Sequence, residues 1–470
     1  MKTNIKVYVL VALLAVLAAC KVKRDPALTK FDYPENFRDV KAADTAGISD
    51  IPWKSFFTDA ALKNLIDSAI RRNNDLQIAV KNIEAAQLYL RQAKLGNLPD
   101  LSLQVTVSSN RPSDNSLNGL SAGQFLGTSH IEDYTAAVAL SWEADIWGKI
   151  RNQKAAALAS YLQTEEARKA VQTQLVAAIS QGYYNLLMLD KQLAIAKRNV
   201  LLNDSTLNII RLQYNSGQVT LLAVQQAEAQ REASAQLVPQ FEQSIAIQEN
   251  GLSILAGKLP ERITEKAELD DIEVPETLSA GIPSAVISRR PDVRSSEWEV
   301  ARADAAAGAA KASLYPSFTI TAQSGLNSLK ASNWFNIPAS LFAQGTAGLT
   351  QPIFQRRRLK TQYEVSKVER EKSVIQFRQS VLVAVGEVSD ALVRLDKLQE
   401  QENIAANRAQ TLQKAIANAR LLFNNGMANY LEIITAQSNV LQSELELADI
   451  KRRQLYAVVD LYRSVGGGWQ

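Results

Sequence analysis

The chain of 470 residues is 46% hydrophobic, and its 52 basic and 48 acidic residues leave a net charge of only +4. Because both signs are interspersed along the chain, this balance argues against a nucleic-acid partner. One cysteine, one histidine and three methionines exclude an internal disulfide and argue against a metal centre, and no phosphate-binding glycine loop is present, so we expect neither an enzyme nor a bound cofactor.

The N-terminus has the pattern of a secretion signal. Lys2 and Lys6 precede a short apolar run, residues 7–19, which is too short to span a membrane. The run ends in Leu-Ala-Ala-Cys, which resembles a bacterial lipobox, so we predict a signal peptide over 1–19 and a covalent lipid on Cys20. The alternative is an ordinary signal peptide that happens to contain a cysteine.

The residue after Cys20 helps to indicate whether a lipidated protein stays in the inner membrane. An aspartate there would resemble an inner-membrane retention signal, whereas this chain has Lys21, which leaves the outer membrane open. Residues 20–52 contain three prolines and are predicted to be an extended tether.

The rest of the chain contains an internal repeat. Three positions recur at a constant shift of 217 residues (Asp75, Lys94 and Pro99 against Asp292, Lys311 and Pro316), and RLQYNSG at 211–217 recurs as RLLFNNG at 420–426, a shift of 209. We therefore predict two repeats, 53–275 and 276–470, each ordered helix, strand, gap, strand, very long helix, turn, long helix.

Four segments alternate between apolar and small polar residues and are predicted to be strands. They lie at about 100–109, 134–142, 316–325 and 341–351. Their polar face carries Ser, Thr, Gln and Ala with almost no charge, which favours transmembrane strands around a wet lumen over a soluble, half-buried sheet.

Four strands cannot close a barrel, and an open sheet edge in lipid would leave backbone groups without hydrogen bonds. The strands must therefore come from several chains embedded in membrane lipid. Two chains would give about eight strands and a narrow interior, whereas three would give about twelve and an aqueous pore. Width alone favours a trimer.

Two long helical hairpins are predicted over 148–256 and 355–466. Their sequences are rich in strong helix formers, and each turn between helices carries Asn and Gly, which suit a left-handed helix end. A stripe of small and apolar residues from Val171 to Val200 predicts one buried face of a coiled coil. The acidic pair Glu165-Glu166 is expected on a solvated helix surface.

Several motifs occur in order at compatible spacing. They are Arg289-Arg290-Pro291-Asp292 followed by the segment 310–317, the segment LSWEADIWGK at 140–149, QPIF at 351–354 and the C-terminal residues 461–469. With the signals above, these motifs resemble the outer-membrane factors of the TolC family, in particular its lipidated, OprM-like (NodT-type) branch. Without the resemblance, Pro291 and Asp292 would simply begin a helix.

The resemblance implies a mainly α fold with transmembrane β-structure. Three chains would form a 12-stranded barrel, four strands from each, continuous with a long α-helical coiled-coil tunnel through the periplasm. The function implied is the outer-membrane exit channel of a tripartite efflux pump, which passes small molecules or drugs from an RND-type or ABC-type inner-membrane transporter and a periplasmic adaptor protein. Two alternatives stay open: the duct of a type I protein secretion system, and a periplasmic coiled-coil scaffold lipoprotein that forms no channel.

The resemblance also assigns roles to residues. The hairpin tips that would contact the adaptor are Asn215, Ser216, Gly217, Gln218 and Val219 in the first repeat and Asn424, Asn425, Gly426, Met427 and Ala428 in the second. The pore gate would lie just past the second tip. Leu431 fits an apolar ring and Glu432 an acidic ring, while Thr435 stands where the family usually has Asp; outside the family, Glu432 would be a solvated helix residue.

Overall fold

The computed structural model describes residue 48 and residues 51–274 and 283–470. The predicted signal peptide, Cys20 and nearly all of the tether therefore lie outside the described residues. The chain divides into two compact units. We call 85–162 with 298–375 the strand unit, and the described residues of 30–84, 163–297 and 376–470 the hairpin unit; each unit draws on both sequence repeats.

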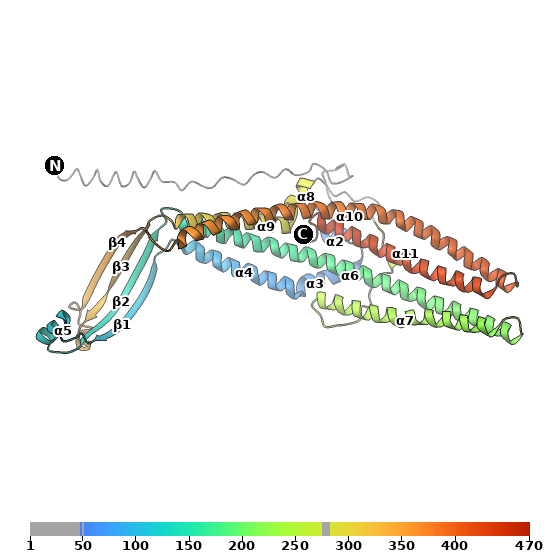
Figure 1. The fold of residues 1–470 in the computed structure, drawn as a ribbon, viewed down its shortest axis with the longest axis horizontal. Coiled ribbons are helices and arrows are strands. Elements are labelled where there is room, and N and C mark those ends of the chain that lie inside the picture. The colour runs from blue at the N-terminus through green and yellow to red at the C-terminus, as the bar shows by residue number, and fades with distance from the viewer. Residues whose placement is uncertain (1–47, 49–50, 275–282) are drawn as a thin grey trace. The chain divides into compact units, whose positions relative to one another are not determined.

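The strand unit contains a four-stranded antiparallel sheet. Its strands are β1 (Asp100–Asn110), β2 (Ile131–Ala144), β3 (Ser317–Ser328) and β4 (Leu341–Thr350), paired in the order β1-β2-β3-β4. The pairing of β2 with β3 joins the two repeats, and β1 and β4 remain as edges of the sheet (Figure 1). The sheet thus has free edges at which further strands can pair.

The register of the sheet places all the predicted apolar alternations on one face. Leu101, Leu140 and Ala322 lie opposite one another in one row, as do Leu103, Val138 and Ser324 in the next. Leu101 and Leu103 are 69% and 74% exposed. The apolar face of β1 is therefore left uncovered by the residues that the structure describes.

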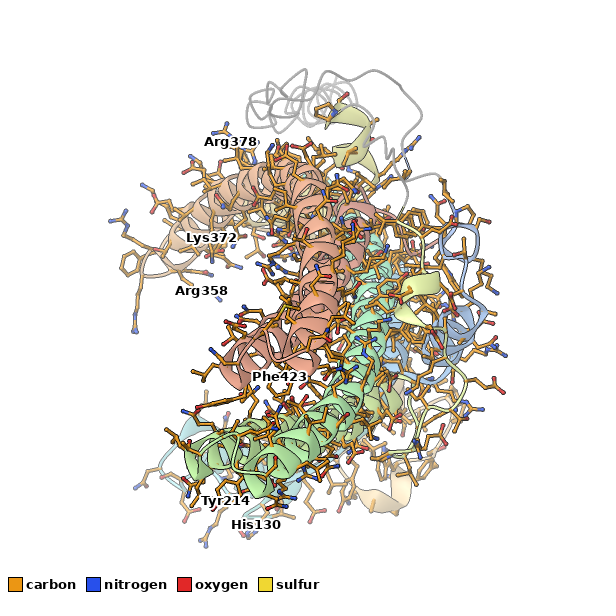
Figure 2. The ribbon with its side chains drawn as sticks, turned by 90° about the vertical axis from the view of Figure 1, so that its right-hand side faces the viewer. His130, Tyr214, Arg358, Lys372, Arg378 and Phe423 are labelled. Atoms are coloured by element: carbon orange, nitrogen blue, oxygen red, sulfur yellow. The ribbon has the colours of Figure 1, made fainter. Side chains whose placement is uncertain are left out.

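The connections between strands are more structured than the sequence predicts. The β1–β2 connection holds α5 (Leu117–Ser121) and the π-helical turn η2 (Ala122–Leu126), and the β3–β4 connection holds the 3₁₀ turn η4 (Ala331–Asn333). Ser116 caps α5 by accepting a hydrogen bond from the Gly119 amide, which explains how so short a helix forms. The sole histidine, His130, is exposed at the end of its loop (Figure 2).

Helix boundaries repeat with the shifts found in the sequence. Helices α4 (Asn74–Leu95) and α9 (Pro291–Ala312) each have 22 residues and are 217 positions apart. Helices α6 (Lys149–Asn215) and α10 (Arg358–Asn424) each have 67 residues and are 209 apart, as are α7 (Leu221–Leu255) and α11 (Tyr430–Ser464) with 35 each. The change from 217 to 209 arises in the loop between strands, which is 111–130 in one repeat and 329–340 in the other.

The long helices form two hairpins in the hairpin unit, α6 with α7 and α10 with α11 (Figure 1). At 1.5 Å per residue, α6 and α10 are each about 100 Å long. The remaining elements are α2 (Trp53–Phe56), α3 (Ala60–Arg72), η3 (Leu269–Asp271) and α8 (Pro283–Arg289). No helix in the described part of the chain is both long and apolar enough to cross a membrane.

The core of the hairpin unit surrounds the middle of α6. Ile179, Leu186 and Leu187 are at most 1% exposed and pack with residues of α3, α7, α10 and α11. The Tyr183 hydroxyl donates to Asp59 at 2.7 Å and accepts from the Ala267 amide at 3.0 Å. The predicted stripe from Val171 to Val200 is buried or half-buried throughout. Other sides of α6 are buried as well, because segments before and after the first hairpin pack against them.

The predicted solvation of Glu166 is wrong. Its side chain is 9% exposed and pairs with Lys169 at 2.8 Å and with Arg294 at 3.7 Å. The Lys169 ammonium in turn lies 4.7 Å from the centre of the Trp469 ring. The Glu166 carboxylate can be buried this deeply because two cations pair with it. Together these contacts join α6 to the start of α9 and to the C-terminus.

Candidate channel gate and hairpin tips

The two hairpin tips have the same backbone geometry. In the first, the Gly217 amide donates to the Tyr214 carbonyl (2.9 Å) and the Gln218 amide to that of Gln213 (2.8 Å). In the second, Gly426 and Met427 make the equivalent bonds at 3.0 and 2.9 Å. This is the Schellman arrangement, which requires a left-handed residue; φ is +76° at Gly217 and +73° at Gly426.

The predicted tip residues are mostly exposed to solvent. All ten are exposed except Val219 and Ala428, which are half-buried and pack against a small cluster between the hairpins. Tyr214 and Phe423 mark the ends of α6 and α10 in Figure 2. The structure thus leaves eight of these ten positions open to a partner.

A common apolar cluster holds the two tips together. Phe423 and Ile433 of the second hairpin, each 4% exposed, pack with Leu207, Ile210 and Ala223 of the first. A further link between the hairpins, which the sequence does not predict, is the hydrogen bond that the buried Gln437 amide donates to the Thr206 hydroxyl at 2.8 Å. A polar residue on an otherwise ordinary helix gives no signal for such a contact.

The three predicted gate residues lie together on one exposed face at the start of α11. Leu431 is 47% exposed, and Glu432 and Thr435 are exposed as well, while Ile433 and Gln437 on the other side of the helix are buried. None of the described residues buries this face. It is therefore available to line a passage or to meet another subunit.

The first turns of α7 and α11 differ. The Asn429 side chain caps α11 by accepting from the amides of Leu431 (2.9 Å) and Glu432 (3.3 Å). Its counterpart Thr220, 209 positions earlier, makes no side-chain capping bond. The counterpart of Glu432 is Ala223, which is fully buried. The role of Asn429 is absent from the sequence-based predictions, although an asparagine directly before a helix is a known capping signal.

The Arg289–Asp292 motif lies at the start of α9. The Arg290 guanidinium is 5% exposed and pairs with Asp292 at 2.6 Å and Glu387 of α10 at 2.8 Å. It also donates to the Ser464 carbonyl, the last residue of α11, at 2.9 Å. Burial opposes ionisation of Asp292, but the hydrogen bonds and charge of Arg290 outweigh it, so the pKa of Asp292 is lowered.

The face of the sheet opposite the apolar one carries polar side chains and is hollowed. Ser102, Ala139, Gln323 and Gln344 form one row across all four strands, and Asp100, Ser141, Thr321 and Thr346 form another. These residues line a shallow cavity on that face. This face of the sheet is therefore polar and hollowed, as is typical of strands that face a wet interior.

The sequence profile of one protein family, described as outer membrane efflux protein, matches residues 65–258 and 282–467. The chain is 27% identical to the probable outer membrane lipoprotein SilC of Salmonella typhimurium, with 97% of each chain covered. It is 28% identical to the antibiotic efflux pump outer membrane protein ArpC of Pseudomonas putida, over 93% of this chain and 88% of ArpC.

A third relative is the cation efflux system protein CusC of Escherichia coli K12, which is 27% identical over 88% of each chain. A crystal structure of CusC, from work on its folding and transmembrane channel formation, superposes with a TM-score of 0.81 at 25% identity and covers 96% of this chain and 100% of CusC. The strand and hairpin arrangement described above is therefore that of an outer-membrane channel.

These comparisons confirm the predicted fold class, a mainly helical chain that supplies four strands to an outer-membrane channel, and the trimeric 12-stranded barrel is consistent with them. They also confirm the predicted place and function, an efflux channel of the outer membrane that extends into the periplasm. The matched profile covers most of the chain, and the chain belongs to the outer membrane efflux protein family.

Proposed function

We propose that three copies of this chain form the passive exit duct of a tripartite efflux pump. A periplasmic adaptor protein contacts the hairpin tips, and an inner-membrane transporter of RND or ABC type supplies the energy. The duct performs no catalysis, and a lipid on Cys20 anchors each chain to the outer membrane.

The observation that carries this proposal is the equality of the two hairpins. Their helices match in length, 67 and 35 residues in each, and their tips make the same hydrogen bonds. Two equivalent tips per chain give six in a trimer, which is the geometry that a ring of identical adaptor contacts needs. The exposed tip residues Asn215–Gln218 and Asn424–Met427 supply those contacts.

The gate belongs to the second hairpin. Leu431, Glu432 and Thr435 share an exposed face, and in a three-fold arrangement each would contribute to a ring. Leu431 gives an apolar constriction and Glu432 a ring of carboxylates, which favours cations over anions. Thr435 adds a neutral hydroxyl ring.

The cargo is proposed to be small molecules, including drugs. The middle rows of the polar sheet face hold hydroxyl and amide side chains, with acidic residues only toward the strand ends, at Asp100, Asp133 and Glu143. Such a surface passes solutes by size rather than by a specific chemical group. ArpC is named for antibiotics and CusC for cations, and both kinds of cargo fit a wide polar passage.

Conductance of the purified protein in planar bilayers tests the proposal. Wild type should migrate as a detergent-requiring, heat-modifiable trimer and give discrete but small conductance steps, because the gate is closed. Leu431→Ser should enlarge the steps severalfold, since it replaces the apolar ring. The matched control is Leu222→Ser, which changes the exposed counterpart of Leu431 in the first repeat.

Two results would contradict the proposal. A protein that becomes a water-soluble monomer once its lipid is removed would favour the scaffold alternative. Equal conductance changes in the Leu431 and Leu222 variants would place the gate elsewhere.

A further inference from the structure

The turn from β4 into α10 contains a strained backbone. Arg356 and Arg357 have φ of +50° and +62°, and they are the only non-glycine residues with positive φ in the described part of the chain. This left-handed region is sterically disfavoured for residues with a Cβ atom. Strain of this kind is found mainly where a side chain has a task that outweighs it.

The repeat shows what an unstrained turn contains. Lys149 begins α6 and Arg358 begins α10, a shift of 209, so Gly148 corresponds to Arg357. Gly148 has φ of +79°, a conformation that glycine adopts without strain. The same turn in the second repeat therefore holds an arginine where a glycine serves the first.

The charges in this turn also differ between the repeats. In the first, Lys149 is neutralised by Glu143 at 2.9 Å. In the second, Arg356 and Arg357 are exposed, Arg358 donates only to the amide oxygen of Gln355 at 2.9 Å, and no carboxylate of the described residues forms an ion pair with any of the three. Three adjacent guanidinium groups thus remain without a counter-charge.

Apolar side chains adjoin these arginines at the same end of the sheet. Ile353 and Phe354 are 95% and 83% exposed. Trp147 stacks on Tyr315 with ring centres 5.0 Å apart, and both rings line one cavity with Arg358, which is labelled in Figure 2. Aromatic and apolar residues beside basic ones are typical of the boundary between hydrocarbon and headgroups.

We infer that residues 353–358 form a lipid contact in which Ile353 and Phe354 enter the acyl region of the periplasmic leaflet and Arg356, Arg357 and Arg358 bind the phosphates of anionic phospholipids. This end of the sheet is the one from which α6 and α10 begin, so it faces the periplasm. A guanidinium can hold a phosphate with two hydrogen bonds. The inference rests on the proposed function, since it requires that the strands cross the outer membrane.

The test titrates the detergent-solubilised full-length protein with dioctanoyl phosphatidylglycerol and follows binding by native mass spectrometry. Dioctanoyl phosphatidylcholine and inorganic phosphate serve as comparison probes. Wild type should prefer phosphatidylglycerol over both. Arg356→Gln with Arg357→Gln should weaken that binding about 30-fold, because each arginine beside an anionic headgroup layer is worth about 5-fold.

Two further variants separate charge loss from misfolding. Lys414→Gln with Arg420→Gln removes two exposed charges from the other end of α10 and should leave binding unchanged. Arg356→Gly with Arg357→Gly should weaken phosphatidylglycerol binding as much as the glutamine pair, yet raise the thermal midpoint because glycine relieves the strained turn.

Several outcomes would overturn the inference. They are equal binding of the two lipids, full competition by inorganic phosphate, and unchanged lipid affinity with altered ion selectivity in the arginine variants, which would place the guanidinium groups in the pore. Normal channel conductance without lipid preference would reject only this inference, whereas absent conductance in wild type would reject the proposed function.

Discussion

Arg290 shows how one side chain can connect the ends of several helices. Arg290 lies directly before α9, forms an ion pair with Glu387 in the middle of α10 and donates to the carbonyl of Ser464 at the end of α11. Arg463 reinforces the same Glu387 at 3.4 Å. A charge buried this deeply is costly by itself, and it is stable here because every side of the guanidinium has a partner.

Replacing Arg290 with Met should lower the free energy of unfolding by about 3 kcal/mol, the low end of the range for breaking a buried pair. The low end applies because Asp292 and Glu387 are 48% and 31% exposed and water can solvate them afterwards. Guanidinium unfolding followed by helical circular dichroism measures the loss. Arg262→Met, at an exposed position, is the control; equal midpoints in both variants would mean that the Arg290 contacts are unimportant for stability.

The hairpins illustrate how equal elements acquire different ends. Both tips close with the same glycine-centred hydrogen bonds, yet only α11 has a side-chain cap, from Asn429. Capping holds the first turn of a helix in place. In α11 that turn carries Leu431 and Glu432, so the cap fixes the two residues that we assign to the gate.

Asn429→Ala should therefore loosen the start of α11 by about 1 kcal/mol. Amide hydrogen exchange at Leu431 and Glu432, which receive the cap in wild type, should speed up about fivefold. Thr220→Ala should leave exchange in the first turn of α7 unchanged, because Thr220 makes no capping bond. Equal acceleration in both variants would show that tip composition, rather than the cap, sets local stability.

At the scale of the whole molecule, the proposed trimer would bring three copies of one exposed glutamate, Glu432, into a ring. Glu432 has an exposed side chain in the individual chain and no counterpart charge in the first repeat, where Ala223 is buried. A narrow ring of carboxylates raises the local concentration of cations and lowers that of anions. The charge selectivity of the channel should therefore depend on this residue.

Glu432→Gln should reduce the cation preference of the channel severalfold, as measured by the reversal potential in a salt gradient. Glu265→Gln removes an exposed carboxylate in the loop after α7 and should preserve the selectivity of wild type. An unchanged reversal potential for Glu432→Gln would show that this side chain does not face the passage.

The amino-acid sequence by itself determined the repeat, the strands and the hairpins. Periodicity suffices for these because an amphipathic strand or helix must bury or expose whole faces, and Gly217 and Gly426 mark the helix ends by the backbone geometry they allow. The gate and tip residues came from family resemblance, and they remain predictions.

The tertiary structure alone decided which polar groups are buried: Glu166 and Arg290 are enclosed by helices distant in sequence, and Gln437 meets Thr206 only after the two hairpins pack. It also decided the strain at Arg356 and Arg357. Sequence patterns report the average environment of a face, whereas burial of a single charge and the φ of a single turn depend on contacts that exist only in the folded chain.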